Sequence, residues 1–522
     1  MKRSVVVGVV SLLLGTALVA VAVAAGAPGD ATRGASVFAQ KCAVCHGTTG
    51  QGNGPAELVL FPKPRDLTSG KFKIRSAPTL PTDDDLLRVV TQGIPGTAMP
   101  GFGVLTERER RDVVAYVKTL SPVWTAQPAP PPIAIPAPPP RTPALLALGK
   151  KFYADAECLK CHGAGGRGDG ESADTLRDEW GYAIVPYDFT MPGRMKAGSG
   201  VRDVYRTLRN GIGGTPMPAY GDSLSEEETW ALAYYVLSLS GGAPRAAAPV
   251  ENGTVRVRRV RGDIAAEPSA KLWRGRPLAA VPLRTLWLRA KQIPEVRVAA
   301  VHNGRDIGVL LEWDDPSADV TALGVEQFRD AVAVQFPVRT TALHAHGHPE
   351  PSYVMGETDN PVNVWHWKAD WQLDVARYRD REDRFARVVV DDAPFVREAR
   401  SSSPEAAAAG VDRHDPLFVT GRAAGNPMSR ARSSAVESLI ATGVGTITSQ
   451  PPDAQVVRGT GRWADGTWRV VIVRALRTSN AGDAQLGAGE ASAVAFAVWD
   501  GAERDRNGQK AVSVWQRLVL EP

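Results

Sequence analysis

Two copies of the motif C-x-x-C-H constrain the fold of this 522-residue chain more than any other feature of its sequence. The copies are CAVCH at 42–46 and CLKCH at 158–162, and together they contain all four cysteines of the chain. No cysteine is therefore left over to form a disulfide, and the thiols are available to a bound group.

The two motifs open a tandem repeat. Each is followed by a glycine-rich loop, then by a short polar motif, and then by a turn that contains Met-Pro. The short motifs are PRDLT at 64–68 and YDFT at 187–190, and the turns are GIPGTAMPGFG at 93–103 and GIGGTPMPAYG at 211–221. Matching motifs in the same order indicate that one module has been duplicated.

Each module ends in an amphipathic stretch that predicts a helix. Thr106 and Ser225 stand at the predicted N-caps, and Glu109 and Glu228 follow three residues later, which is the spacing of a capping box. A short helical stretch also precedes each C-x-x-C-H motif. The sequence therefore predicts two all-α domains of the same fold.

The C-x-x-C-H spacing is typical of covalent haem attachment. Two cysteines on one helical turn can each add to a vinyl group of a porphyrin, and the adjacent histidine is then held under the iron. Zinc would need two further thiol or imidazole ligands, and neither module contains another cysteine or histidine. The predicted haem c ligands are Cys42, Cys45 and His46 in the first module and Cys158, Cys161 and His162 in the second.

The Met-Pro turns predict the second axial ligand of each iron. Met99 is the only methionine of the first module, whereas Met191, Met195 and Met217 compete in the second. Met217 occupies the same position in its turn as Met99 and is therefore preferred; the alternative is a methionine that only fills a gap in the core. Histidine and methionine together close both axial positions, which favours electron transfer over catalysis. With these motifs, both modules resemble class I cytochrome c domains.

The third part of the chain has a different pattern. It contains ten of the thirteen tryptophans and many runs in which apolar residues alternate with others, separated by turn residues. The clearest runs lie at 255–260, 296–301, 307–313, 331–336, 469–476 and 493–499. Several short strands of this kind predict an all-β sandwich or barrel. The polar, Ala/Ser-rich stretch 380–450 is predicted to form mostly long loops.

Five segments of this third part resemble a known family. They are FRDAVAVQFPV at 328–338, YVMGETDNPVNVWHWKADWQ at 353–372, ATGVGTIT at 441–448, AVAFAVWDG at 493–501 and GQKAVSVWQRL at 508–518. They are similar to the haem-binding domain of ethylbenzene dehydrogenase-type gamma subunits, which serve periplasmic molybdoenzymes of the dimethyl sulfoxide reductase family. The resemblance implies a β-sandwich that holds one haem b through a methionine and a lysine, at the positions of Met355 and Lys510. This chain departs from the family in carrying two C-x-x-C-H modules in front.

The resemblance also implies the partners. It suggests a molybdopterin catalytic subunit and an iron–sulfur subunit, or another periplasmic redox protein, with electrons passing to or from the respiratory chain. The chain itself has no molybdopterin, iron–sulfur or flavin signature, so we expect an electron-transfer subunit rather than an enzyme. Its net charge of +5 is too small and too dispersed for a nucleic-acid binder.

The N-terminus predicts export. Lys2 and Arg3 precede an apolar run from Val5 to Ala25 that ends in small residues. This is the pattern of a Sec-type signal peptide, and the run is also long enough to remain as a membrane anchor. Both alternatives place the remainder of the chain in the periplasm.

The expected organisation combines these parts. A Pro/Ala tract and a weaker break at 242–253 act as spacers, because such segments cannot build a core. The expected parts are 1–26, signal peptide or N-terminal anchor; 30–122, first cytochrome c domain; 123–143, Pro-rich linker; 144–241, second cytochrome c domain; 242–253, linker; and 254–522, β-sandwich with haem b.

Other interpretations stay open at this point. The sandwich could instead bind carbohydrate, or the chain could be a dihaem peroxidase, which would need one open iron. His344, His346 and His348 alternate as metal ligands would on a strand, but a solvated loop is the simpler interpretation. Arg256, Arg258, Arg259 and Arg261 could dock an acidic partner or form a solvated strand face, and Trp365, Trp367 and Trp371 could line a sugar site or belong to the core or a haem-pocket wall.

Overall fold

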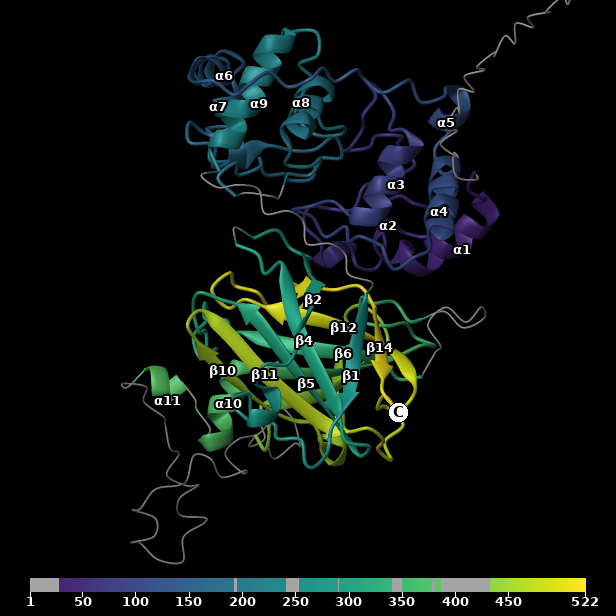
Figure 1. Ribbon diagram of the computed structural model, residues 1–522, viewed down its shortest axis with the longest axis vertical. Coiled ribbons are helices and arrows are strands. Elements are labelled where there is room, and N and C mark those ends of the chain that lie inside the picture. The colour runs from purple at the N-terminus through teal and green to yellow at the C-terminus, as the bar shows by residue number, and fades with distance from the viewer. Residues whose placement is uncertain are drawn as a thin grey trace, which may run out of the picture.

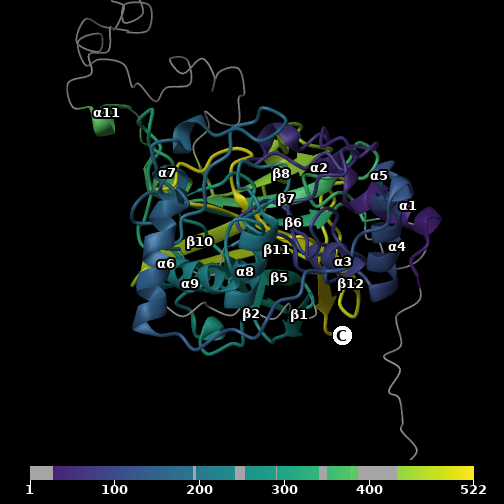
Figure 2. The same cartoon turned by 90° about the horizontal axis from the view of Figure 1, so that it is seen from above.

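The computed structural model describes residues 28–191, 195–240, 253–289, 291–339, 350–377, 379, 381–385 and 432–522. It shows two helical modules side by side above a large β-structure (Figures 1 and 2). The predicted leader 1–26 and the three alternating histidines between 344 and 348 lie outside the described residues. Among the described residues, no helix combines the length and the apolar character needed to cross a membrane.

The first helical module closes around a crossing of its first and last long helices. Its helices are α1 (Ala31–Lys41), α2 (Ala43–His46), η1 (Glu57–Val59), α3 (Asp83–Gln92), α4 (Glu107–Thr119) and α5 (Val123–Ala126). The crossing of α1 and α4 requires Gly34, because a Cβ there would lie 1.9 Å from the carbonyl oxygen of Asp112. The predicted capping box is confirmed, since the Thr106 hydroxyl accepts the Glu109 N–H at 3.2 Å.

The second module repeats this construction. Its helices are α6 (Pro143–Asp155), α7 (Cys158–His162), η2 (Ala173–Thr175), α8 (Val201–Asn210) and α9 (Glu226–Ser238). Gly149 allows the crossing of α6 and α9, where a Cβ would lie 2.1 Å from the carbonyl oxygen of Ala231. Ser225 caps α9 as predicted. Two equivalent glycines at equivalent crossings confirm that both halves have the same helical fold.

The Pro/Ala tract between the modules is extended, as expected, but it is bound along both of them. The Ile133 N–H donates to Ser76 O at 2.9 Å on the first module. On the second module, the Arg202 guanidinium donates to Ile135 O at 3.0 Å and the Tyr234 hydroxyl to Pro139 O at 2.8 Å. These bonds fix the modules relative to one another more firmly than a free spacer would.

The β-structure consists of two layers that share one strand. The first layer contains β10 (Arg458–Ala464), β11 (Thr467–Ala475), β5 (Asp306–Asp314), β4 (Glu295–His302), β1 (Thr254–Arg259) and β14 (Gln516–Leu520), with β2 (Ala279–Pro282) beside β4. The second contains β12 (Ala491–Trp499), β6 (Ala331–Pro337), β7 (Val362–Lys368), β8 (Val436–Ala441) and β9 (Thr448–Ser449), with β13 (Ala511–Val512) and β3 (Arg284–Thr285) beyond β12. The first half of β12 pairs with β14 and its second half with β6.

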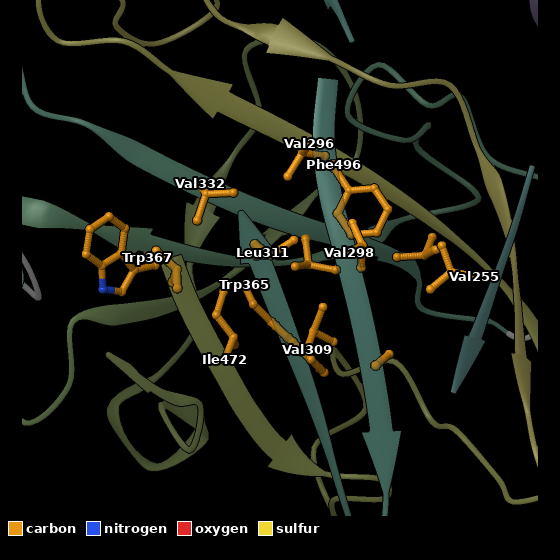
Figure 3. Packing of buried hydrophobic residues seen from close by; sticks show 14 of the residues in the cluster. Val255, Val296, Val298, Val309, Leu311, Val332, Trp365, Trp367, Ile472 and Phe496 are labelled. Atoms are coloured by element: carbon orange, nitrogen blue, oxygen red, sulfur yellow. The ribbon is translucent and has the colours of Figure 1, made fainter. Parts of the chain in front are cut away.

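The six predicted strands are all present, and the core lies between the two layers. Trp365 and Trp367 point into this core from β7 and pack with aliphatic side chains of the facing layer (Figure 3). Both indoles have no exposed surface, so they are core residues and not the wall of a sugar site. Arg256 and Arg258 point to solvent on β1, which agrees with a solvated strand face.

The stretch 380–450 contains more structure than the predicted long loops. β8 runs through it and pairs with β7 in the interior of the second layer. Its sequence VESLIA does not alternate, because Glu437 and Ser438 are both buried and hydrogen-bonded inside the protein. Short helices α10 (Ala369–Ala376), α11 (Arg381–Arg384), η3 (Lys271–Trp273) and η5 (Pro452–Ala454) complete the described elements.

The outer face of the second layer is covered by the first helical module. Phe61 forms backbone hydrogen bonds with Leu286 and Leu288 at 3.0 and 2.8 Å, and its ring packs on Trp287 with centroids 5.3 Å apart. Lys41 forms an ion pair with Glu350 at 2.7 Å. Apolar side chains from both parts make one continuous cluster. This docking places the first C-x-x-C-H module directly against the sandwich.

Candidate haem sites

The four predicted ligand residues of the first module line one cavity. Cys42, Cys45, His46 and Met99 surround an empty space of about 1170 Å³ whose other walls are mostly apolar. The two thiols are free, and burial raises their pKa to about 12, so both are neutral thiols near pH 7. Two thiols, an imidazole and a thioether around an apolar cavity fit a covalently attached haem c.

The histidine of each motif is oriented by a backbone carbonyl. The Nδ1 atom of His46 lies 2.9 Å from Arg65 O, and that of His162 lies 3.0 Å from Tyr187 O. A carbonyl can only accept, so Nδ1 carries the proton and Nε2 is left as the basic nitrogen available to a metal. Burial lowers the pKa of both imidazoles, which keeps them neutral as a ligand must be.

The two Met-Pro turns are built alike, bond for bond. In the first module the Met99 N–H donates to Thr97 Oγ1 at 3.2 Å, and the threonine hydroxyl donates to Ile94 O at 2.8 Å. In the second module the Met217 N–H donates to Thr215 Oγ1 at 3.3 Å, and its hydroxyl to Ile212 O at 2.8 Å. The equivalence that the sequence suggested therefore extends to the hydrogen bonds that position each methionine.

The second cavity collects its own ligand set. Cys158, Cys161, His162 and Met217 line an empty space of about 1180 Å³, and Met195 lines it too. Met191 is not among the lining residues. The structure thus brings two of the three competing methionines to the site, and the matched turn distinguishes Met217 from Met195.

A third cavity lies on the outer face of the second β-layer, and it contains both Met355 and Lys510. The Nζ atom of Lys510 lies 3.5 Å from Sδ of Met355 and 4.8 Å from the centre of the Trp499 ring. Lys510 is 8% exposed, and burial lowers the pKa of its ammonium to about 8. The neutral amine, which is the form that can bind iron, is therefore within reach near neutral pH.

Met355 is held in an unusual backbone conformation. Its φ angle is +70°, a left-handed conformation that is rare for residues other than glycine, and Gly356 follows with a φ of +72°. The Met355 carbonyl accepts the N–H of Gly443 at 2.9 Å. Strain of this kind persists where the surrounding structure fixes a residue, and it is frequent at ligand sites.

Polar groups that sequence reasoning missed also line the third cavity. His366 stacks on Trp499 with ring centres 4.5 Å apart, and its Nε2 has no hydrogen-bond partner. Lys368 and Glu437 form a buried ion pair in the cavity wall. The alternation of β7 could have revealed these side chains, since His366 and Lys368 share the face opposite to Trp365 and Trp367.

Tyr353 connects the first and third cavities. It lines both of them, its ring lies edge-on to Phe102 with ring centres 6.4 Å apart, and its hydroxyl lies close enough to the Cys45 thiol to lower the pKa of that thiol. Val59 of the first module also lines the third cavity. One side chain thus separates the two sites.

Basic side chains lie between the first and second cavities. Lys73 lines the first and Lys196 the second, and each follows the matched motif of its module, PRDLT or YDFT. Burial, then Arg65 and Lys196, lower the pKa of Lys73 to about 7. The Arg65 guanidinium stacks on Trp180 at 4.1 Å and donates to Gly213 O at 3.2 Å across the module contact. Three basic side chains, Arg65, Lys73 and Lys196, therefore lie close together where the two cavities approach each other, with Asp178 nearby.

Three known protein families match separate parts of this chain. The ethylbenzene dehydrogenase family matches residues 271–511, and the family of cytochrome c oxidase, cbb3-type, subunit III matches 29–117, while the cytochrome c family matches 146–240. The chain thus combines an ethylbenzene dehydrogenase-type gamma-subunit domain with two cytochrome c domains. The predicted all-α and all-β fold classes and the predicted covalent haem c are thereby confirmed.

Several curated relatives of this chain are named as haem or gamma subunits. A putative respiratory nitrate reductase heme subunit of Haloferax mediterranei is 27% identical over 49% of this chain and 68% of its own length. The chlorate reductase subunit gamma of Ideonella dechloratans is 26% identical over 53% of this chain and 89% of its own. Cytochrome c-554(547) of Halothiobacillus neapolitanus is 33% identical over 18% of this chain and 98% of its own. The prediction of an electron-transfer subunit that is not itself catalytic is confirmed.

Among solved structures, the reducing HAO-like protein complex Kustc0457/Kustc0458 of Kuenenia stuttgartiensis matches 40% of this chain and 96% of its own chain, at 39% identity and a TM-score of 0.39. A carbohydrate-binding module of Caldicellulosiruptor kristjanssonii matches 51% of this chain at 8% identity and a TM-score of 0.25. A similarity at that level carries no argument about sugar binding.

Proposed function

We propose that this chain is a gamma-type subunit that acts as an exported three-haem electron carrier, with two haems c and one haem b. It exchanges electrons between the catalytic and iron–sulfur subunits of a periplasmic molybdoenzyme, or another periplasmic redox protein, and the respiratory chain. The names of the relatives support a reductase or dehydrogenase complex as the partner. The sequence of the leader supports the periplasm as the location.

The observation that carries the proposal is the meeting of the buried Lys510 and Met355 in one cavity. A lysine without an anionic partner is costly to bury, and the described residues give Lys510 none. An iron between the amine and the thioether would satisfy both. We therefore assign Met355 and Lys510 to haem b, His46 and Met99 to the first haem c, and His162 and Met217 to the second.

The order of the three sites follows from their contacts. Tyr353 lies between the third cavity and the first, and the Arg65, Lys73 and Lys196 cluster lies between the first and the second. The order that these contacts favour is haem b, first haem c, second haem c. Electrons exchanged with haem b then pass through the first haem c before they reach the second.

Lys73 and Lys196 have a role in this arrangement. Each c-type haem carries two propionates, whose negative charges must be compensated once they leave water. Lys73 and Lys196 line the two cavities without forming an ion pair within the described residues. We assign each of them to a propionate of the haem in its own module.

A haem assay tests the proposal. The full chain is produced with its own leader in a host that matures c-type cytochromes, and its haem is assayed by pyridine haemochrome before and after acid-acetone extraction. The expected result is two covalent haems and one extractable haem per chain. A protein with no extractable haem would overturn the assignment of haem b and leave the sandwich as a protein-binding module.

A further inference from the structure

Three buried aspartates meet at one end of the sandwich, and none of them lines a haem cavity, although their chain neighbours Ala331 and Trp499 line the third one. Asp315 follows β5 directly, Asp330 immediately precedes β6, and Asp500 follows β12 directly. Their side chains are 1%, 0% and 7% exposed, and one carboxylate oxygen from each lies within 4.8 Å of the other two. Three carboxylates are thus enclosed together by strands from both layers.

The hydrogen bonds of these carboxylates leave one oxygen without a donor. Both oxygens of Asp330 have hydrogen-bond donors: they accept from the N–H groups of Gly501 and Asp319 and from the Trp468 indole at 2.7–2.9 Å. Oδ1 of Asp500 accepts from Glu503 N at 3.1 Å. Oδ1 of Asp315 accepts from Ser317 N at 3.2 Å, but its Oδ2 is fully enclosed and has no partner.

The Trp313 indole also lies near this carboxylate. It lowers the pKa of Asp315 as a weak donor would, but its Nε1 does not reach hydrogen-bond geometry with Oδ2. An enclosed carboxylate oxygen without a donor loses its hydration and gains no hydrogen bond in return, which destabilises the folded protein. A hydrogen-bond donor or a cation at Asp315 Oδ2 would offset this cost.

No basic side chain supplies the missing charge. Within the described part of the chain, no lysine, arginine or histidine forms an ion pair with Asp315, Asp330 or Asp500. Burial and mutual repulsion accordingly raise the pKa of Asp315 to about 6 and that of Asp330 to about 8. Two agents can relieve this repulsion: protons held on the carboxylates, or a cation between them.

We propose that Asp315, Asp330 and Asp500 bind a divalent cation of the oxygen-preferring class, with Ca²⁺ as the expected ion. The donor set consists of oxygens only, without thiol or imidazole, which selects a hard cation. Oxygens that lie within 4.8 Å of one another can surround a single Ca²⁺, whose ligands lie about 2.3–2.6 Å from the ion. The unpartnered Oδ2 of Asp315 then becomes a ligand atom.

Such an ion would join both layers of the sandwich and the loop that carries Lys510. Asp500 begins this loop, and its carbonyl accepts the N–H of Asp505 at 3.0 Å. Asp505 is held in turn by the Arg289 guanidinium at 3.0 Å. The proposed ion would thus fix the first residue of the segment 500–510 in place. The cation proposal does not depend on haem b, because its ligands are all carboxylates outside the haem cavities.

The test uses the full-length, haem-loaded protein. Its calcium content is measured by mass spectrometry, the ion is removed with EDTA, and the stripped protein is titrated with CaCl₂ by calorimetry and thermal melting. We expect about one Ca²⁺ per chain and a Tm that falls on stripping and returns with Ca²⁺. Asp453→Asn, at an exposed position, is the control and should behave like the wild type.

Asp315→Asn separates the cation from the alternative of bound protons. Without metal, the variant should melt at or above the wild-type Tm, because one of the three crowded charges is gone. With Ca²⁺, the wild type should gain stability and the variant should gain little. If the purified wild type contains no metal and neither EDTA nor CaCl₂ shifts its Tm, the proposal is overturned and the carboxylates share protons instead.

Discussion

Lys510 Nζ lies 3.5 Å from Met355 Sδ, although the two residues are 155 positions apart in the chain. Lys510 immediately precedes β13, and Met355 lies in the loop before β7. Both residues therefore lie in loops that lead into strands of the second β-layer. The left-handed backbone at Met355 and the burial of Lys510 both cost free energy in a protein without a ligand. A bound haem b would offset both costs, which makes this pair the most direct place to test the assignment.

Lys510→Ala should remove haem b and leave both haems c in place. The thioether bonds of the c-type haems do not depend on the sandwich, whereas haem b would lose one of two axial ligands. Pyridine haemochrome should show the ratio of c to b change from about two to one to little or no b. Lys271→Ala, an exposed lysine of the same domain, is the matched control and should keep all three haems. Retention of extractable haem with unchanged spectra in Lys510→Ala would contradict the assignment.

Met217→Ala and Met195→Ala should separate the two methionines of the second cavity. Loss of the true ligand should lower the potential of one haem by roughly 0.1 V or more, because axial ligands set haem potentials over a range of about 0.8 V. It should also remove about one third of the weak sulfur-to-iron absorption band, since three methionines are assigned to iron, while both covalent haems remain. We expect these changes in Met217→Ala and a near wild-type titration in Met195→Ala. The reverse result would move the ligand to Met195.

Lys73→Gln and Lys196→Gln should each lower the potential of the haem in their own module. Removing a positive charge next to a propionate leaves that propionate uncompensated, which disfavours an added electron. A change of about 1 kcal/mol corresponds to about 40 mV for one electron. Potentiometric titration followed by optical spectroscopy measures the shift. Lys71→Gln alters an exposed lysine close by and should leave both potentials nearly unchanged; equal shifts in all three variants would indicate a general charge effect.

Expression without residues 1–26 should give a colourless protein in the cytoplasm. The thiols of both motifs must meet haem outside the cytoplasmic membrane, where c-type maturation takes place. The full-length chain, produced in parallel, should carry covalent haem that survives denaturing electrophoresis. Covalent haem in the truncated protein would contradict the proposed export.

Local sequence patterns predicted much of this protein, because its elements follow regular rules. The capping boxes at Thr106 and Ser225 and the six alternating runs all depend on residues close together in the chain. β8 escaped prediction because Glu437 pairs with Lys368 in the interior and breaks the alternation. The burial of Lys73 and the meeting of Asp315 with Asp500 are set by tertiary packing, and no pattern in neighbouring residues reports them.

Met99→Ala and Met217→Ala should affect electron exchange with haem b differently. If the order is haem b, first haem c, second haem c, a lower potential at the first haem c makes it an uphill step between the other two. Exchange between haem b and the second haem c should then slow by about tenfold for every 1.4 kcal/mol of added barrier. The same change at the second haem c leaves the contact through Tyr353 intact, so exchange between haem b and the first haem c should keep its wild-type rate.

Pulse reduction of the oxidised protein, followed at the absorption bands of haem b and haem c, measures this exchange. Both variants keep covalent haem, so a difference between them reports the sequence of the haems rather than the loss of a module. Slower equilibration of haem b in Met217→Ala than in Met99→Ala would place the second haem c next to haem b. Unchanged equilibration with the second haem c in Met99→Ala would require a direct route that bypasses the first module. Tyr353 lines both the first and the third cavities but not the second, so we expect neither outcome.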